Sequence, residues 1–220
     1  MLVFSLLKQH NFPIPKFWIY HHKYGWINNK IPSNDILLIS KPVYESASIG
    51  ITSDSVSKFN YGYEKKIIEL SQYLNQPIIV QEFIFGWEVE VPVFDVNIPV
   101  TLSTVGIEQN KEKCLNDKFL TYDHIYFDNY SFYNYDEENY TNAQKLKDIA
   151  TNSYRCLDLD GSVRVDFRVD KSGQAFITDY NNSPHLTKFH SFAKSAEYYN
   201  LSYVNMFCLV LYKAMRKIID

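Results

Sequence analysis

The apolar and polar residues alternate in patterns that predict mixed α and β structure along the whole chain. Helical spacing of apolar residues predicts helices over residues 2–10, 64–74, 138–157 and 197–218, and Ser53 is placed to cap a short helix that runs to Phe59. Continuous apolar runs or strict alternation predict strands over 36–40, 77–84, 87–94 and within 96–107. Residues 110–136 are polar and lack a clear period, so we expect a long loop there.

A hairpin over residues 161–184, GSVRVDFRVDKSGQAFITDYNNSP, carries polar residues at regular intervals. If Asp170 faces Gly173 in the turn, Asp166 faces Ile177, and Asp179 is its diagonal neighbour. One face of the hairpin then carries Arg164, Asp166, Asp179 and Asn181. The other face packs into the core and carries Val163, Val165, Phe167, Val169, Phe176 and Tyr180.

The polar face of this hairpin has two interpretations. Neighbouring carboxylates repel each other unless a cation lies between them. Arg164 would supply that cation on a charge-balanced, solvated sheet face. Asn181, however, adds a third oxygen ligand to Asp166 and Asp179, and such a set suits a hard divalent ion such as Mg²⁺. The residues alone leave both interpretations open.

The composition of the chain argues against several classes of protein. The chain has 220 residues, 46% of them hydrophobic, and a net charge of −3, so it can build one large domain or two small lobes. Lys and Arg form no basic stripe, which argues against a nucleic-acid partner. The three cysteines are widely spaced without a CxxC pair, so we expect a reducing cytoplasm rather than disulfides or zinc. No apolar run is long enough to span a bilayer, so we expect no membrane partner.

Four motifs, in order along the chain, resemble those of the ATP-grasp superfamily, specifically the D-alanine–D-alanine ligases. They are ISKPVYESASIGI, VQEFIFGWEVEVPVF, RVDFRVDKSGQAFITDYNNSPHLT and AKSAEYYNLSYVNMF. The resemblance implies an α+β, ATP-grasp fold in which two lobes clamp a nucleotide between antiparallel sheets. Residues 1–86 would form the small lobe with the phosphate loop, and residues 87–220 the C-terminal lobe with the metal site.

The resemblance also implies a set of nucleotide-binding residues. Lys41 would contact the phosphates as a point charge. The loop from Glu45 to Gly50 would close over the phosphates, with Ser48 donating a hydrogen bond to them. The adenine and ribose contacts would come from the hinge and the strand after it, at Gln81, Glu82, Ile84 and Glu88.

The same resemblance implies the reaction. Asp166, Asp179 and Asn181 would hold Mg²⁺, or Mn²⁺ in its place, against the ATP phosphates. Arg164 would stabilise the charge of an acyl phosphate or tetrahedral intermediate, and Ser191 would bind the substrate carboxylate. The implied activity is an ADP-forming carboxylate–amine ligase that acts on an amino acid or short peptide.

Several positions depart from the family pattern. Ile125 stands where the family has a phosphate-binding lysine, His185 replaces a glycine after Pro184, and Ser46 and Ala47 replace Gly-Ser. The family also has an N-terminal domain before this region. These departures leave an alternative, a weakened or inactive ATP-binding module that acts with a partner chain supplying the missing domain. A homodimer is compatible with either hypothesis.

Overall fold

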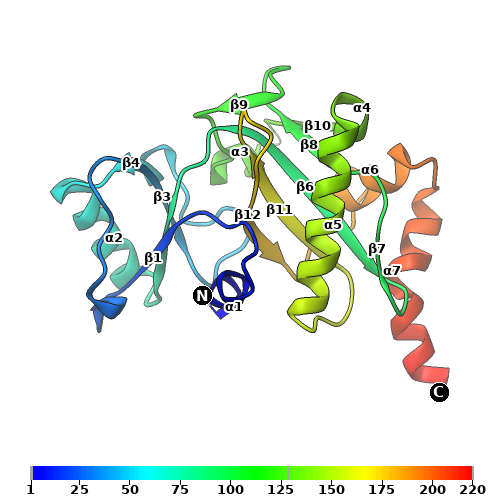
Figure 1. The fold of residues 1–220 in the computed structure, drawn as a ribbon, viewed down its shortest axis with the longest axis horizontal. Helices are drawn as coiled ribbons and strands as arrows, with labels where there is room; N and C mark the ends of the chain where they lie inside the picture. Colours follow the sequence, from blue (N-terminus) through cyan, green and yellow to red (C-terminus); the bar gives the residue numbers. More distant parts are fainter. Residues whose placement is uncertain (1, 128, 220) are drawn as a thin grey trace. The chain divides into compact units, whose positions relative to one another are not determined.

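The computed structural model describes residues 2–127 and 129–219 and shows the expected α+β class, with helices packed on antiparallel sheets. The chain forms two compact units (Figure 1). The first combines Pro15–Ile84 with Asp117–Tyr130, and the second combines Leu2–Ile14, Phe85–Asn116 and the residues from Ser131 onward. The division into functional lobes at residues 86 and 87 stays a prediction.

The first unit is a five-stranded sheet covered by one long helix. The sheet order is β2-β1-β5-β3-β4, with β1 at Phe17–His21, β2 at Gly25–Trp26, β3 at Leu37–Pro42, β4 at Val56–Lys58 and β5 at Ile78–Glu82. Helix α2 (Tyr61–Tyr73) begins where the Asn60 side chain accepts a hydrogen bond from the Tyr63 backbone N–H. It packs Tyr63 and Ile67 onto the buried face of the sheet. The unit also contains the 3-10 turns η1 (Ile27–Asn29) and η2 (Ser53–Ser55), and helix α3 (Tyr122–Tyr126).

The short helix expected from Ser53 to Phe59 is wrong beyond its first turn. The N-cap of η2 is Thr52 rather than the predicted Ser53, and the Ser55 side chain accepts a hydrogen bond from the Thr52 backbone N–H at the start of the turn. Val56 then pairs with Ile39, so the chain continues as strand β4. A local cap favours the turn, but pairing with a buried strand decides the residues that follow.

The second unit is built on a seven-stranded sheet. Its order is β10-β8-β6-β11-β12, with β7 and β9 also paired to β6. The strands are β6 (Gly86–Asp95), β7 (Pro99–Thr101), β8 (Val105–Glu108), β9 (Cys114–Asn116), β10 (Ser131–Asn134), β11 (Val163–Val169) and β12 (Ala175–Asn181). The single strand expected within residues 96–107 is therefore two strands. The expected loop over 110–136 contains β9, α3, β10 and the start of α4 (Tyr135–Glu138), because sheet pairing does not require an apolar period at an edge.

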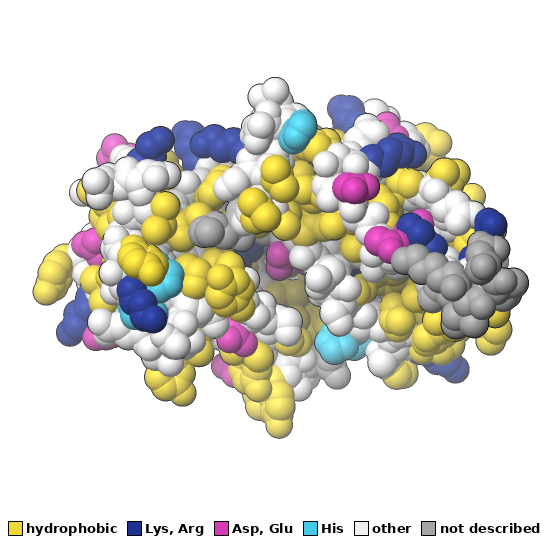
Figure 2. Space-filling model, turned by 90° about the horizontal axis from the view of Figure 1, so that it is seen from below, with side chains coloured by type: hydrophobic (Ala, Val, Ile, Leu, Met, Phe, Trp, Pro, Cys, Tyr) yellow, Lys and Arg dark blue, Asp and Glu magenta, His cyan; other side chains and the backbone are white. Residues whose placement is uncertain are grey.

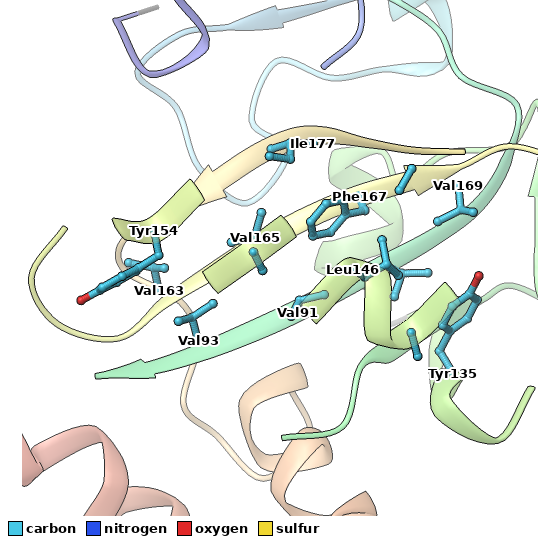
Figure 3. Packing of buried hydrophobic residues seen from close by; sticks show 14 of the residues in the cluster. Val91, Val93, Tyr135, Leu146, Tyr154, Val163, Val165, Phe167, Val169 and Ile177 are labelled. Carbon is cyan, nitrogen blue, oxygen red and sulfur yellow. The ribbon is translucent and has the colours of Figure 1, made fainter. Parts of the chain in front are cut away.

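Helix α5 (Tyr140–Cys156) covers one face of this sheet. Figure 3 shows Leu146 and Tyr154 from α5 among the valines of β6 and β11, with Phe167 near the centre. Burying such side chains is worth about 1.5–3 kcal/mol each before the entropy of ordering is subtracted. Helix α1 (Leu2–Gln9) adds Leu7 to the same cluster.

Helices α6 (Ser191–Tyr198) and α7 (Tyr203–Ile219) replace the single C-terminal helix expected over residues 197–218. Asn200 adopts a left-handed φ of 60°, which ends α6, and the Ser202 side chain accepts a hydrogen bond from the Asn205 backbone N–H at the start of α7. Phe192 and Met206 from these helices pack with Phe94 of β6. The odd-numbered valines of β6 therefore face α5, while its even-numbered residues face the α6 side.

Apolar side chains are spread over the molecular face in Figure 2. Tyr61, Tyr73 and Phe189 are among the most exposed of the described large hydrophobic residues. Scattered exposed apolar residues are an ordinary feature of protein surfaces and mark no site. Within residues 2–127 and 129–219, no helix is long and apolar enough to cross a membrane.

Candidate functional site

The β11–β12 hairpin brings the predicted polar residues to one face, but in a different register. Asp166 pairs directly with Asp179, and Arg164 pairs with Asn181. The expected pairing of Asp166 with Ile177 is wrong because the turn and β12 each contain one extra residue. Gly173, with a φ of 82°, makes the turn one residue longer than expected, and a bulge follows between Asp166 and Phe167.

The extra residue in the turn and the extra residue in β12 cancel in their effect on side-chain direction, because each shifts the alternation by one position. Asp179 and Asn181 therefore share a face with Arg164 and Asp166, as predicted. Between the turn and the bulge, the predicted side-chain directions are wrong. Phe176 pairs with Arg168 on the polar side, while Ala175 and Ile177 enter the core.

Arg164 lies between two carboxylates. Its Nε and Nη2 donate to the two oxygens of Asp166 at 2.6 and 2.8 Å, a bidentate pairing. Its Nη2 is also 3.3 Å from Glu90 Oε1. All three side chains are largely buried, so these charges interact with little screening.

A second ion pair, between Arg168 and Glu88, joins the same two strands, β11 and β6. Arg168 Nη1 donates to Glu88 Oε2 at 3.1 Å, and its Nη2 donates to the Asn116 backbone carbonyl at 2.8 Å. Cross-strand pairing places Glu88 beside Arg168 and Glu90 beside Asp166. The predicted ribose-binding Glu88 is thus held in place by an ion pair, with 22% of its side chain exposed.

Sequence reasoning missed Glu90 and Arg168. The signal was present, because strict alternation in WEVEVPVF puts Glu88 and Glu90 on one face of the strand. What the sequence lacked was the pairing of β6 with β11, which brings Glu90 next to Asp166. Glu90 is 6% exposed, and its Oε2 has no hydrogen-bond partner.

The cluster holds more carboxyl groups than guanidinium groups. Four carboxyl groups, those of Glu88, Glu90, Asp166 and Asp179, face the guanidinium groups of Arg164 and Arg168. Burial raises the pKa of Glu90 to about 7, with Asp166 and Glu88 adding to the rise and Arg164 opposing it. Burial also raises the pKa of Asp166, helped by Asp179 and Glu88 and opposed by Arg164. Two carboxyls that resist ionisation beside arginines indicate a place where further positive charge is favourable.

The donor set fits a hard divalent cation. Asp166 and Asp179 are direct cross-strand neighbours, and Asn181 follows two residues later on the same face. Asp179 Oδ1 and Asn181 Oδ1 each accept one backbone N–H, from Tyr180 and Ser183, and an oxygen that accepts one hydrogen bond retains a lone pair. Among the described residues, no three His, Cys, Asp or Glu side chains form a metal-binding group, so the candidate set depends on the Asn181 amide.

Ser191 begins helix α6 on the same side of the sheet. It is 1% exposed, and its hydroxyl has no hydrogen-bond partner. The hydroxyl is close enough to the Glu90 carboxyl to favour its ionised form, although it makes no hydrogen bond of ordinary geometry. The fold therefore places Ser191 beside the acidic cluster of its own unit, while its role toward a substrate stays a prediction.

The predicted phosphate loop lies in the first unit, after β3. Lys41 is the next-to-last residue of β3. Ala47 and Ser48 both have left-handed φ values, 51° and 55°, which costs backbone strain in residues other than glycine. Ser48 Oγ donates to the Leu120 carbonyl at 3.5 Å, so the loop contacts the segment that carries Ile125.

Glu45 is tied down at the base of this loop. The buried Gln76 side chain donates to Glu45 Oε1 at 2.7 Å and accepts the Tyr44 backbone N–H at 2.7 Å. One amide thus holds two consecutive loop residues. In this structure the Glu45 side chain binds Gln76 and so anchors the loop. Its role toward phosphates stays a prediction.

Gln81, Glu82 and Ile84 lie at the end of β5 and just beyond it. Gln81 is 1% exposed, and neither its Nε2 nor its Oε1 has a hydrogen-bond partner. The Glu82 backbone N–H donates to the Lys16 carbonyl at 2.8 Å, and the Glu82 side chain is half-buried. A buried amide with both its donor and its acceptor unused is able to bind the edge of a nucleobase, which offers both kinds of group.

Comparisons with known proteins agree with this architecture. The model of the family described as D-ala D-ala ligase C-terminus matches residues 6–211. D-alanine–D-alanine ligase from Halothermothrix orenii is 25% identical over 210 residues, covering 92% of this chain and 58% of the relative. The ligase from Acetivibrio thermocellus is 30% identical over 168 residues, covering 74% of this chain and 43% of the relative. The chain thus spans about half the length of these curated relatives.

Solved structures show the same fold. D-alanine–D-alanine ligase from Bacillus anthracis complexed with ATP has a TM-score of 0.70 at 14% identity, covering 98% of this chain and 65% of that one. VanG D-Ala:D-Ser ligase from Enterococcus faecalis has a TM-score of 0.69 at 19% identity, covering 95% of this chain and 59% of that one. The expected ATP-grasp fold is confirmed. The chain belongs to the D-alanine–D-alanine ligase C-terminal family.

Proposed function

We propose that this protein is an ADP-forming carboxylate–amine ligase that uses ATP and Mg²⁺ and joins amino acids or short peptides. The observation that carries the proposal is the direct pairing of Asp166 with Asp179 in a carboxyl-rich cluster that also holds Arg164. Phosphoryl transfer needs positioning and charge neutralisation more than covalent help from the protein, and this cluster offers groups for both.

In this proposal Asp166, Asp179 and Asn181 hold Mg²⁺. The ion, when bound, neutralises phosphate charge during transfer. Arg164 is kept charged by the carboxylates around it, which raise its pKa well above the ordinary value against the effect of burial. A guanidinium fixed in this way can stabilise the negative charge of an acyl phosphate or of the adduct formed by an attacking amine.

Ser191 and Glu88 are proposed to orient ligands in the second unit. The Ser191 hydroxyl has no competing partner and would donate to the carboxylate of an amino-acid substrate. Glu88, fixed by Arg168, would accept hydrogen bonds from the ribose hydroxyls. Glu88 is already held in place by this ion pair, which lowers the entropic cost of binding there.

In the first unit, we propose that Lys41 and Ser48 bind phosphate oxygens and that Glu45 keeps the loop in shape through Gln76. Gln81 is proposed to bind the adenine edge, with Glu82 and Ile84 contributing at the end of the same strand. The unused donor and acceptor of Gln81 support this role, because a ligand that satisfied both would remove an unfavourable feature of the free protein.

The proposal is tested by mixing the protein with ATP, Mg²⁺ and single amino acids or dipeptides, D-alanine included, and measuring ADP release. Amino-acid-dependent ADP is expected from the unchanged protein. It should fall about 10²-fold or more in Asp179→Asn, since that exposed carboxylate is a proposed metal ligand whose replacement leaves the core intact. ADP release that is independent of every amino acid, or absent from folded protein, would count against the proposal.

A second candidate function is an ATP-binding module with little turnover that acts with a partner chain. It is favoured by Ile125, which lies in α3 where the family has a phosphate-binding lysine. It predicts that ATP and Mg²⁺ raise the melting temperature without ADP release, with about 2.7 kcal/mol of stabilisation at a hundred times the dissociation constant. Turnover in the ADP assay distinguishes the ligase from this module.

A further inference from the structure

The Arg164 guanidinium has two carboxylates within reach but is fully engaged by only one. Asp166 accepts from Nε at 2.6 Å and from Nη2 at 2.8 Å. Glu90 Oε1 is 3.3 Å from the same Nη2. Glu90 Oε2 is buried and has no hydrogen-bond partner. Glu90 therefore holds unused capacity to accept N–H groups from a neighbouring donor.

An unpartnered oxygen on a buried carboxylate is unfavourable, because water cannot replace the missing donor. Glu90 is 6% exposed, and the described groups that act on it electrostatically are Arg164, Asp166, Glu88 and the Ser191 hydroxyl. The Ser191 hydroxyl can donate a hydrogen bond to only one oxygen, and Arg164 is the only cation in that set. The group able to engage both oxygens of Glu90 at once is therefore the Arg164 guanidinium, which is occupied by Asp166.

A divalent cation on Asp166 would change this balance. The cation and the guanidinium would compete for the same two carboxylate oxygens and would repel each other. If Arg164 then had no second acceptor, a buried guanidinium would lose its paired anion, which is strongly unfavourable. Glu90, on the strand next to Asp166, is placed to receive it.

We propose that Glu90 is a positioning residue that accepts the Arg164 guanidinium when a divalent cation binds Asp166. The inference rests on the proposed metal site and adds to it a defined task for a carboxylate that the ligase mechanism does not otherwise use. Arg164 remains charged, paired and fixed in the cluster while Asp166 is free to bind the cation. No covalent bond changes in this exchange of partners.

The other carboxylates of the cluster are not placed for this task. Glu88 is paired with Arg168 at 3.1 Å, and no ion pair joins it to Arg164 among the described residues. Asp179 lies opposite Asp166 on β12 and belongs to the same proposed metal set. Asp166 thus has a proposed metal partner on one neighbouring strand and the alternative acceptor for Arg164 on the other.

The exchange is tested by observing the Arg164 Nε–H resonance by NMR while MgCl₂ is added to the full chain without nucleotide. The resonance is assigned by its loss in Arg164→Lys. In the unchanged protein, we expect it to shift with Mg²⁺ and to stay protected from water. In Glu90→Gln, adding Mg²⁺ should speed its exchange with water at least about tenfold, because a neutral amide is a weaker acceptor. Glu88→Gln removes the same charge but not the acceptor, and it should behave as the unchanged protein does.

Three results would overturn the inference. They are an Arg164 resonance that Mg²⁺ does not move, equal effects of Glu90→Gln and Glu88→Gln, and continued protection of Arg164 in Glu90→Gln with Mg²⁺ bound. None of these readouts depends on ADP formation. A protein that shows the exchange but releases no ADP would support the positioning role while counting against the ligase activity.

A second experiment needs no metal ion and uses Asp166→Asn, which weakens the acceptor that Arg164 uses in this structure. Arg164 should then depend on Glu90. Adding Glu90→Gln should raise the unfolding equilibrium constant in urea at least about tenfold more in the Asp166→Asn protein than in the unchanged protein. Glu88→Gln is the matched control and should show no such dependence. Equal effects of Glu90→Gln in the two proteins would contradict the proposed exchange.

Discussion

Replacing Asp95 with Asn should weaken the second unit severely, because this carboxylate joins three elements. Asp95 ends β6 and is 3% exposed. Its Oδ2 accepts from Tyr154 of α5 at 2.8 Å, from the Gly161 backbone N–H at 3.0 Å and from Lys213 of α7 at 2.6 Å. Asn keeps the shape but loses the charge, so the three donors would face a neutral carbonyl oxygen, which is a weaker acceptor than a carboxylate.

The cost can be estimated from these contacts. Hydrogen bonds to a charged group contribute about 1.5–3 kcal/mol each when buried, and leaving a buried donor unsatisfied costs about 1–3 kcal/mol. Lys213 is 30% exposed, so its pairing is screened and contributes about 1 kcal/mol or less. We expect Asp95→Asn to lower the free energy of unfolding by about 3 kcal/mol at pH 7. Lys213→Met, as the matched control, should cost about 1 kcal/mol.

The effect should depend on pH in a defined direction. Burial alone would raise the pKa of Asp95, but hydrogen bonds from Lys213, Gly161 and Tyr154 outweigh it and lower that pKa below its ordinary value. A lowered folded-state pKa stabilises the protein above the unfolded value near 4. That contribution disappears as the pH falls through the folded-state pKa.

Urea unfolding of the unchanged protein and of Asp95→Asn, from pH 7 down to pH 3, checks this prediction. The difference in unfolding free energy should be about 3 kcal/mol at pH 7 and should shrink steadily below about pH 4. A difference that is the same at both pH values would refute the reasoning, since the cost would then come from side-chain shape rather than charge. A difference below about 0.5 kcal/mol at pH 7 would show that the network contributes little.

Three further predictions follow from individual residues. Gly106→Ala should lower the free energy of unfolding by about 1–3 kcal/mol in urea titrations, because its new Cβ would lie 2.2 Å from the Tyr133 ring. An unchanged midpoint of urea unfolding would mean that the ring moves freely. Ala47→Gly should raise stability by about 1 kcal/mol, since Ala47 has a φ of 51°, and thermal melts that show a loss instead would place the strain elsewhere. Ile125→Lys should tighten ATP binding about tenfold in calorimetry if α3 contacts phosphate. An unchanged affinity would show that α3 does not contact the nucleotide.

Part of the candidate site could be read from the sequence, because the relevant patterns are local. Alternation along β11 and β12 placed Arg164, Asp166, Asp179 and Asn181 on one face, and side-chain direction in a strand depends only on position along that strand. Helices α1, α2 and α5 were recognised for the same reason, since the spacing of apolar residues records which face is buried. The family motifs also lie within short segments.

Only the tertiary structure decided which carboxylates meet. Thr178 lies at a bulge that no local signal in β12 announces, and it moves Asp179 directly opposite Asp166. Glu90 belongs to a strand distant in sequence, and its place beside Asp166 follows from the pairing of β6 with β11. Strand pairing minimises the free energy of the whole sheet rather than of any one segment. For that reason the sequence predicted the residues of the polar face, while the fold decided their partners and their charge balance.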